Sequence, residues 1–164
     1  MVKNSLKLFL GMLLIFAFVT GSQPLARAGV SGPSAAVAQT TEAKVDLWLK
    51  NSGYNFRKTG KATWLINHPD LSSSEMPLLV AAGPDFVVIG VVVEFKKNLS
   101  FSKESMFKLL RLSHSIDYVK IGFDDDEDLF VRAEVKTKLL DQQEFKNIVE
   151  TCARAAVRIR GELA

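Results

Sequence analysis

The clearest hydrophobic pattern in the chain is a strict alternation over residues 117–135, on both sides of an acidic turn at 124–128. The alternating apolar residues are Val119, Ile121, Phe123, Leu129, Val131, Ala133 and Val135. A period of two residues is that of a β-strand with one buried face. The segment therefore predicts a β-hairpin that presents its carboxylates to solvent at the turn.

Three other segments repeat their apolar residues every three to four positions, which is the period of an amphipathic helix. They cover residues 42–52, about 103–113 and about 142–160. Residues that can cap the three N-termini are Thr41, either Ser100 or Ser102, and Asp141. The apolar residues of the second helix are Met106, Phe107, Leu109, Leu110 and Leu112. Those of the third are Phe145, Ile148, Val149, Cys152, Ala156 and Ile159.

Shorter apolar segments predict strands before the second helix. They lie at residues 54–58, 62–67, 78–82 and 86–95, and a polar loop is expected at 71–75. Short turns join consecutive strands, so we expect a mainly antiparallel sheet. The order is a helix, three or four strands, a helix, two strands and a helix. The fold class is therefore α+β, with a sheet of about five strands packed with helices.

The strand at residues 86–95 begins with eight residues, 86–93, that carry no polar side chain. A strand with one wet face alternates, so this strand must be covered on both faces, by the domain itself or by a partner. We take Phe86, Val88, Val92 and Trp64 as candidate partner-binding residues. The expected partner is a protein or peptide, or a second copy in a homodimer.

Residues 1–28 have the layout of a secretory signal peptide. Lys3 and Lys7 precede an apolar run at 8–19, and an A-x-A site ends at Ala28. The alternative is an uncleaved anchor, but the run is shorter than the roughly 18 residues of a membrane span. Residues 29–41 are small and polar, as in a flexible linker. We therefore expect an exported domain at 42–164, periplasmic or secreted, with no stable membrane span after cleavage.

Cleavage also changes the charge balance of the protein. The whole chain has 21 Lys and Arg against 18 Asp and Glu, and three of the cations lie in the first 28 residues. The mature chain would carry 18 of each sign and be near neutral. Nucleic-acid binding requires a basic face, so it is not expected.

No motif for catalysis, a cofactor or a metal is found in the sequence. An EF-hand loop starting at Asp124 would need Gly and Glu where the chain has Leu129 and Val135. His68 and His114 are the only histidines and lack zinc-site spacing. The lone Cys152 lies among small apolar residues and is expected to be buried. We predict no catalytic, cofactor-binding or metal-binding residues.

The stretch 109–150 resembles the core of YbjN-like domains, which share the fold of type III secretion chaperones of the Tir-chaperone-like class. The resemblance rests on a helix with Leu110 and His114, the charged turn at 124–128, and Leu140-Asp141 followed by Phe145. It extends more loosely over residues 42–161. It implies the order α-β-β-β-α-β-β-α, a domain that is often dimeric, and binding of a protein segment along the sheet or helices.

Three hypotheses on function follow. The first is an exported, non-enzymatic, chaperone-like module that binds a protein or peptide. The alternative is a small-ligand-binding or enzymatic domain, with a pocket between sheet and helices lined by Tyr54, Trp64, His68 and His114. The third is a structural component of the cell envelope that acts through its N-terminal tether.

Overall fold

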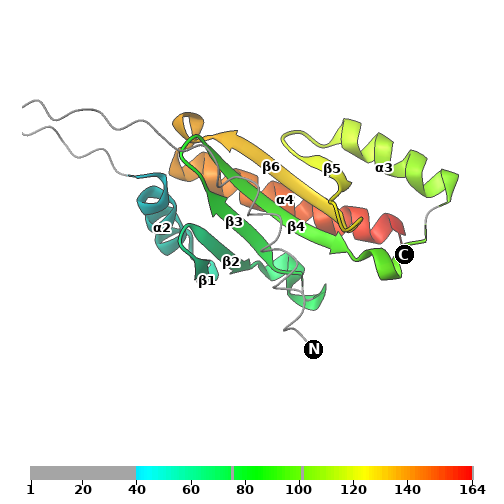
Figure 1. Cartoon of the computed structure of the whole chain (residues 1–164), viewed down its shortest axis with the longest axis horizontal. Coiled ribbons are helices and arrows are strands. Elements are labelled where there is room, and N and C mark those ends of the chain that lie inside the picture. The colour runs from blue at the N-terminus through cyan, green and yellow to red at the C-terminus, as the bar shows by residue number, and fades with distance from the viewer. Residues whose placement is uncertain (1–39, 75, 101, 164) are drawn as a thin grey trace, which may run out of the picture. The chain divides into compact units, whose positions relative to one another are not determined.

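The computed structural model of the chain describes residues 40–74, 76–100 and 102–163. They form one antiparallel sheet of six strands with helices packed against it (Figure 1). The signal peptide predicted at 1–28, and the linker at 29–41 except its last two residues, lie outside the described residues. No helix in the described part of the chain combines the length and the apolar composition that a membrane span needs.

The order of the strands across the sheet is β1-β2-β3-β4-β6-β5, and all neighbours are antiparallel. The strands are Asn55–Gly60 (β1), Thr63–Asn67 (β2), Leu78–Ala82 (β3), Phe86–Glu94 (β4), Lys120–Phe123 (β5) and Leu129–Lys136 (β6). The helices are Thr41–Ser52 (α2), Lys103–Ser115 (α3) and Gln142–Leu163 (α4), with short 3₁₀ turns at Pro69–Ser74 (η2), Lys96–Asn98 (η3) and Thr137–Leu139 (η4). The predicted α+β class is confirmed.

The sheet has six strands where about five were expected. All four segments predicted as strands before α3 are strands, where the order implied by the resemblance has three. The additional strand comes from the tight hairpin of β1 and β2, in which Phe56 pairs with Ile66 and Gly60 with Thr63. Strand β1 lies at the edge of the sheet and is mostly exposed, so its apolar alternation is weak.

One face of the sheet, here called the inner face, carries the hydrophobic core. Helix α4 packs on β4 and β6, α2 contacts β3 and α4, and α3 contacts α4 and β5. The strand residues of the core are Trp64, Ile66, Leu78, Val80, Val87, Ile89, Val91, Val93, Leu129, Val131 and Ala133. These residues alternate along each strand, so the residues between them point to the opposite, outer face.

The expected stripe of α4 is confirmed, since all six of its predicted residues are buried in the core. The helix starts are also close to prediction. Ser102 accepts a hydrogen bond from the backbone N–H of Ser105 (3.0 Å), and Asp141 accepts one from Glu144 (2.8 Å). At α2 the prediction was wrong by one residue, because Thr40 rather than Thr41 is the cap.

Two further local predictions differ from the structure. The expected polar loop at 71–75 begins within η2, and Leu71 is buried in the core. Tyr118 was expected in a strand, but its φ of 68° is left-handed and β5 starts at Lys120. A left-handed residue interrupts extended pairing, so the first arm of the hairpin is short.

Candidate functional site

The outer face of the sheet is apolar over its central strands. Leu65 of β2 pairs with Leu79 of β3, and Leu79 pairs with Gly90 of β4. In the neighbouring rows, Ala81 pairs with Val88, and Val92 pairs with Phe130. None of these residues belongs to the core cluster that α2, α3 and α4 share with the inner face. Among the described elements no helix packs on this face, but Leu65, Leu79 and Ala81 at its centre are buried, so its exposed part lies around Phe86.

The structure places three of the four candidate partner-binding residues on this outer face. Phe86 is 43% exposed, while Val88 and Val92 are half-buried. Trp64 faces the other way and is fully buried in the core, where its indole N–H donates to Asp46 (2.7 Å). Trp64 therefore does not reach the surface, and we leave it out of the proposed binding surface.

Charged residues of β5 and β6 form the border of the apolar part of the outer face. Glu134 contacts Lys120 Nζ at 2.8 Å and Arg132 Nη2 at 2.9 Å. The Arg132 guanidinium lies 5.0 Å from the centroid of the Phe130 ring, and that ring covers Gly122, whose added Cβ would lie 3.2 Å from it. Both ion pairs use the single Glu134 carboxylate, so this border keeps one positive charge in excess.

A second apolar surface lies on α3. The sequence pattern gives this helix a broad apolar side, of which only Leu109 and Leu112 are buried. Met106, Phe107 and Leu110 are 38%, 62% and 67% exposed. We call these three residues the α3 face. A helix at the end of the sheet touches the core along one narrow stripe only, so three of its five apolar residues remain in solvent.

The residues predicted to line a ligand pocket are not brought together. Tyr54 and His68 are neighbours, with ring centroids 5.5 Å apart, but Trp64 is in the core and His114 is exposed on α3. A surface cavity of about 320 Å³ between α3 and α4 contains none of the four. It is lined by Lys108, Arg111, Leu112, Ser115, Arg158 and Glu162.

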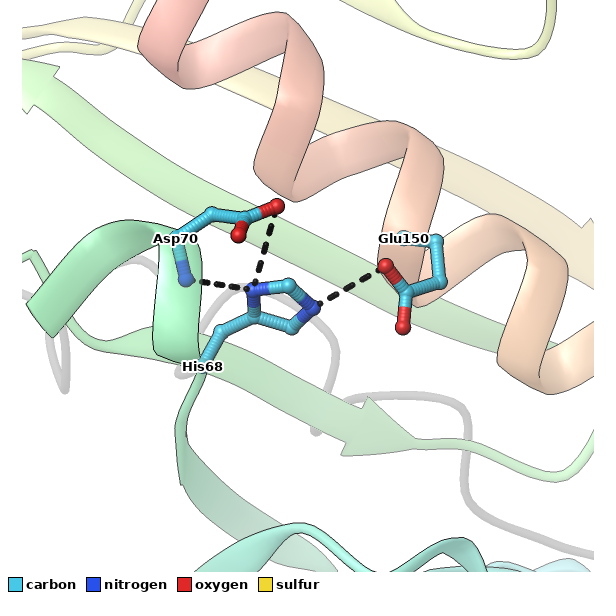
Figure 2. Close-up of side chains that lie close together, drawn as sticks. All are labelled: His68, Asp70 and Glu150. Carbon is cyan, nitrogen blue, oxygen red and sulfur yellow. Dashed lines mark hydrogen bonds and ion pairs between the residues drawn. The ribbon is translucent and has the colours of Figure 1, made fainter.

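Figure 2 shows a polar cluster in which His68, at the end of β2, lies between η2 and α4. The His68 side chain is 3% exposed. Its Nδ1 accepts a hydrogen bond from the backbone N–H of Asp70 (3.3 Å) and lies 4.0 Å from the Asp70 carboxylate. Its Nε2 lies 3.3 Å from Glu150 Oε2, yet the contact lacks hydrogen-bond geometry, so this buried atom has no hydrogen-bond partner among the described residues.

Tyr54 completes this cluster from the segment between α2 and β1. Its hydroxyl donates to Glu150 Oε1 (2.7 Å). Burial and this hydrogen bond raise the pKa of Tyr54 far above its usual value, so the phenol stays protonated. Burial also acts to raise the pKa of Glu150, but the hydrogen bond from Tyr54 and the adjacent His68 outweigh it, and that pKa is lowered. Glu150 is therefore a carboxylate at neutral pH.

Replacing Tyr54 with Phe is expected to destabilise the protein by about 1 kcal/mol at pH 7, because a charge-assisted hydrogen bond is lost at a partly exposed carboxylate. The folded-state pKa of Glu150 lies below its ordinary 4.5. The contribution is therefore present above pH 4.5 and lost as the pH falls through the folded-state value. Urea unfolding at pH 7 and pH 3 measures the difference, and an equal loss at both pH values would contradict this account.

Sequence reasoning did not find this cluster. His68 and Asp70 are two residues apart in one turn, but Glu150 lies on a helix that is far away in the sequence. In sequence it is only one polar residue beside the buried Val149. Of the residues that the structure describes, only His68, Asp70 and Glu150 form a group with ligand atoms close enough to hold one metal ion.

The acidic turn is less exposed than its sequence indicates. Asp128 is buried, and its carboxylate accepts the backbone N–H of Lys96 (2.7 Å). Asp124 accepts the backbone N–H groups of Asp126 and Asp128, and Glu127 takes a left-handed φ of 62°. These carboxylates shape the turn and attach it to η3.

Cys152 is fully buried, as expected. Burial raises the pKa of its thiol to about 12, and the Sγ lies 3.6 Å from the Ile89 carbonyl oxygen. A thiolate is the reactive form, so the native protein should resist iodoacetamide and react only after unfolding in urea. Mass spectrometry after labelling tests this, and rapid modification without denaturant would contradict it.

Comparison with known proteins finds similar folds but no similar sequences. No protein-family model matches the chain, and no curated protein matches it. Several solved structures do match over most of their length.

One is a chain of the heterodimeric ExoU–SpcU complex from the type III secretion system of Pseudomonas aeruginosa. The two chains superimpose with a TM-score of 0.59 and share 17% sequence identity, and the match covers 73% of this chain and 97% of that one. Another is the Yersinia pestis type III secretion chaperone SycH in complex with a fragment of YscM2 (TM-score 0.53, 8% identity, 73% and 99% covered). A third is YbjN from E. coli (TM-score 0.52, 12% identity, 76% and 91% covered). The resemblance found in the sequence is thus confirmed for the fold.

Proposed function

We propose that this chain, which has the fold of type III secretion chaperones and of YbjN, is an exported, non-enzymatic, chaperone-like domain that acts by binding protein. The observation that carries the proposal is the apolar outer face of the sheet, on which the large side chain of Phe86 is 43% exposed. Large apolar side chains gathered at one place on a surface are typical of protein interaction sites. The two structural relatives above from type III secretion systems are themselves complexes with another protein.

The occupant we assign to the α3 face is a second copy of the chain. Glu104 and Arg111 lie two turns apart on the same side of α3, with Phe107 between them. When two copies of α3 cross in antiparallel orientation near Phe107, Glu104 of each copy approaches Arg111 of the other. The contact buries apolar residues and pairs opposite charges twice, as a two-fold symmetric interface requires.

The outer face of the sheet is the surface we assign to a different protein. Phe86 is an exposed aromatic residue, and aromatic residues are typical anchors of protein interfaces. Val88 and Val92 continue the apolar row along β4, on the same side of the strand. Because β4 is paired on both sides, the ligand that fits them is a polypeptide segment with an apolar face that binds through its side chains.

Photo-crosslinking tests the assignment of the outer face. A photoreactive phenylalanine analogue is placed at Phe86 or Val92, and at the exposed Lys146 on α4 as a control, in cells that export the protein. The account expects one and the same protein to be captured from Phe86 and from Val92, and not from Lys146. Capture at all three positions, or at none, would remove the support for this surface.

Export rests on the first 28 residues and has its own test. The exported protein is purified from the periplasm or the medium, and its N-terminus is determined by mass spectrometry. A signal peptide cleaved after Ala28 gives a mature chain that starts at Gly29. Recovery of the chain only with its first 28 residues attached would instead favour an uncleaved anchor.

A further inference from the structure

We propose that His68 and Glu150, with Asp70 behind them, form a site for one divalent cation of the zinc type. The proposal is independent of the protein-binding function. The cluster joins three parts of the chain, since His68 directly follows β2, Asp70 lies in η2 and Glu150 lies on α4 (Figure 2). Imidazole nitrogen and carboxylate oxygen are both ligands that zinc accepts in proteins.

The first observation that points to a ligand is the state of His68 Nε2. The atom is buried, lies 3.3 Å from the Glu150 carboxylate and forms no hydrogen bond within the described part of the chain. Buried polar atoms almost always have a partner, so an unpaired imidazole nitrogen calls for an explanation. A metal ion bound to Nε2 and Oε2 would satisfy both atoms.

The second observation is the spacing of these two atoms. Two ligands of a tetrahedral zinc ion, each about 2.1 Å from the metal, lie about 3.4 Å from one another. His68 Nε2 and Glu150 Oε2 are separated by 3.3 Å. These two ligand atoms already have the separation that the ion requires, and solvent can complete the coordination because Glu150 lies partly at the surface.

Metal binding requires a change of tautomer at His68. In the structure Nδ1 accepts the backbone N–H of Asp70, so the proton of the neutral ring is on Nε2. Nε2 can bind a metal only when this proton is lost to solvent and Nδ1 carries one instead. The Asp70 carboxylate is 4.0 Å from Nδ1 and half-exposed, so a movement of about 1 Å makes it the acceptor. A carboxylate that accepts the second N–H is the usual partner of a metal-bound histidine.

The surroundings of Glu150 orient its carboxylate for this role. The Tyr54 hydroxyl donates to Oε1, which leaves Oε2 directed at His68. Arg154 Nη1 lies 4.0 Å from Oε2 and is a competing cation, but its side chain is 64% exposed and can turn into solvent. Removing that competitor with Arg154→Gln should therefore strengthen metal binding.

Calorimetric titration of the purified protein with Zn²⁺, and absorption spectroscopy with Co²⁺, test the proposal. The expected result is one equivalent of Zn²⁺ or Co²⁺ bound and removed by EDTA, with no comparable binding of Mg²⁺ or Ca²⁺. Glu150→Gln should weaken binding at least tenfold, and Asp70→Asn should weaken it about tenfold, as expected for a residue that orients a ligand.

Matched controls separate this site from adventitious binding. Glu162→Gln makes the same change on the same helix, and His114→Gln removes the exposed histidine, so neither should alter the affinity. Absence of saturable binding would overturn the proposal, as would equal affinity in wild type and Glu150→Gln, or loss of binding in His114→Gln.

A spectroscopic measurement tests the proposal without any variant. Nitrogen-15 NMR of the histidine rings reports which nitrogen carries the proton. His68 should change from the Nε2–H to the Nδ1–H tautomer when one equivalent of Zn²⁺ is added. An unchanged His68 tautomer in the presence of saturating Zn²⁺ would overturn the proposal.

Discussion

Replacing Trp64 with Ala is expected to destabilise the protein by about 3–5 kcal/mol, the range for truncating a large buried aromatic residue. Trp64 is fully buried beneath α2, and its indole N–H donates to Asp46. The Lys58 ammonium lies 5.2 Å from the centre of its ring. The variant loses the packing of the ring, leaves a cavity and removes the donor to Asp46.

Chemical unfolding followed by circular dichroism measures this loss. Trp64→Phe keeps most of the packing and loses only the indole hydrogen bond and some volume, so it should cost clearly less than Trp64→Ala. A cost below about 1 kcal/mol for Trp64→Ala would mean that the residue is not part of the core. It would then again be a candidate for partner binding.

Replacing both Phe107 and Leu110 with Glu is expected to convert a dimer into a monomer. The two side chains are the most exposed of the α3 face, so the charges cost little in the monomer. In the dimer, four carboxylates would be buried at one contact with too few cations to pair them, and buried unpaired charges are strongly unfavourable. Light scattering coupled to size-exclusion chromatography reports the mass directly.

Leu139→Glu is the matched control for this result. Leu139 is 66% exposed and lies in η4, outside α3, so its replacement should leave the dimer intact. The proposed charge pairs add a second test, because Glu104→Arg should weaken the dimer and Arg111→Glu should restore it in the same chain. A wild-type protein that stays monomeric at high concentration would contradict the assignment of the α3 face.

The sequence predicts those elements whose burial follows a single period. Helix α4 lies on the centre of the sheet, so its apolar residues at helical spacing are all buried. Buried and partly exposed residues alternate along β6, the second strand of the β5–β6 hairpin, because one face of this strand packs against α4. In both elements the apolar residues that recur with the period of the element all face the core, so the pattern alone predicts their burial.

Prediction fails where burial depends on what lies beside the element. Phe107 and Leu110 have the same apolar character as Leu109, and only the position of α3 at the end of the sheet decides which of them are covered. Leu71 is a single apolar residue in a polar segment, so no periodicity indicates that it reaches the core.

The candidate sites show the same limit. The apolar run at 86–93 correctly identifies a strand with two apolar faces, but it cannot tell which of them the helices cover. The contact of His68 with Glu150 depends on how η2 packs against α4. Local patterns carry no information on contacts between residues so far apart in the chain.

The most direct test of the account is the affinity of the outer face for the protein that crosslinks to it. The dissociation constant is measured for the wild type and for the double variant Phe86→Ser, Val92→Thr, which removes an aromatic anchor and an apolar methyl group. The account predicts a complex at least tenfold weaker for the double variant, while Lys146→Ser leaves the affinity unchanged. Equal affinities of the wild type and the double variant would contradict the claim that this domain binds protein through the outer face of its sheet.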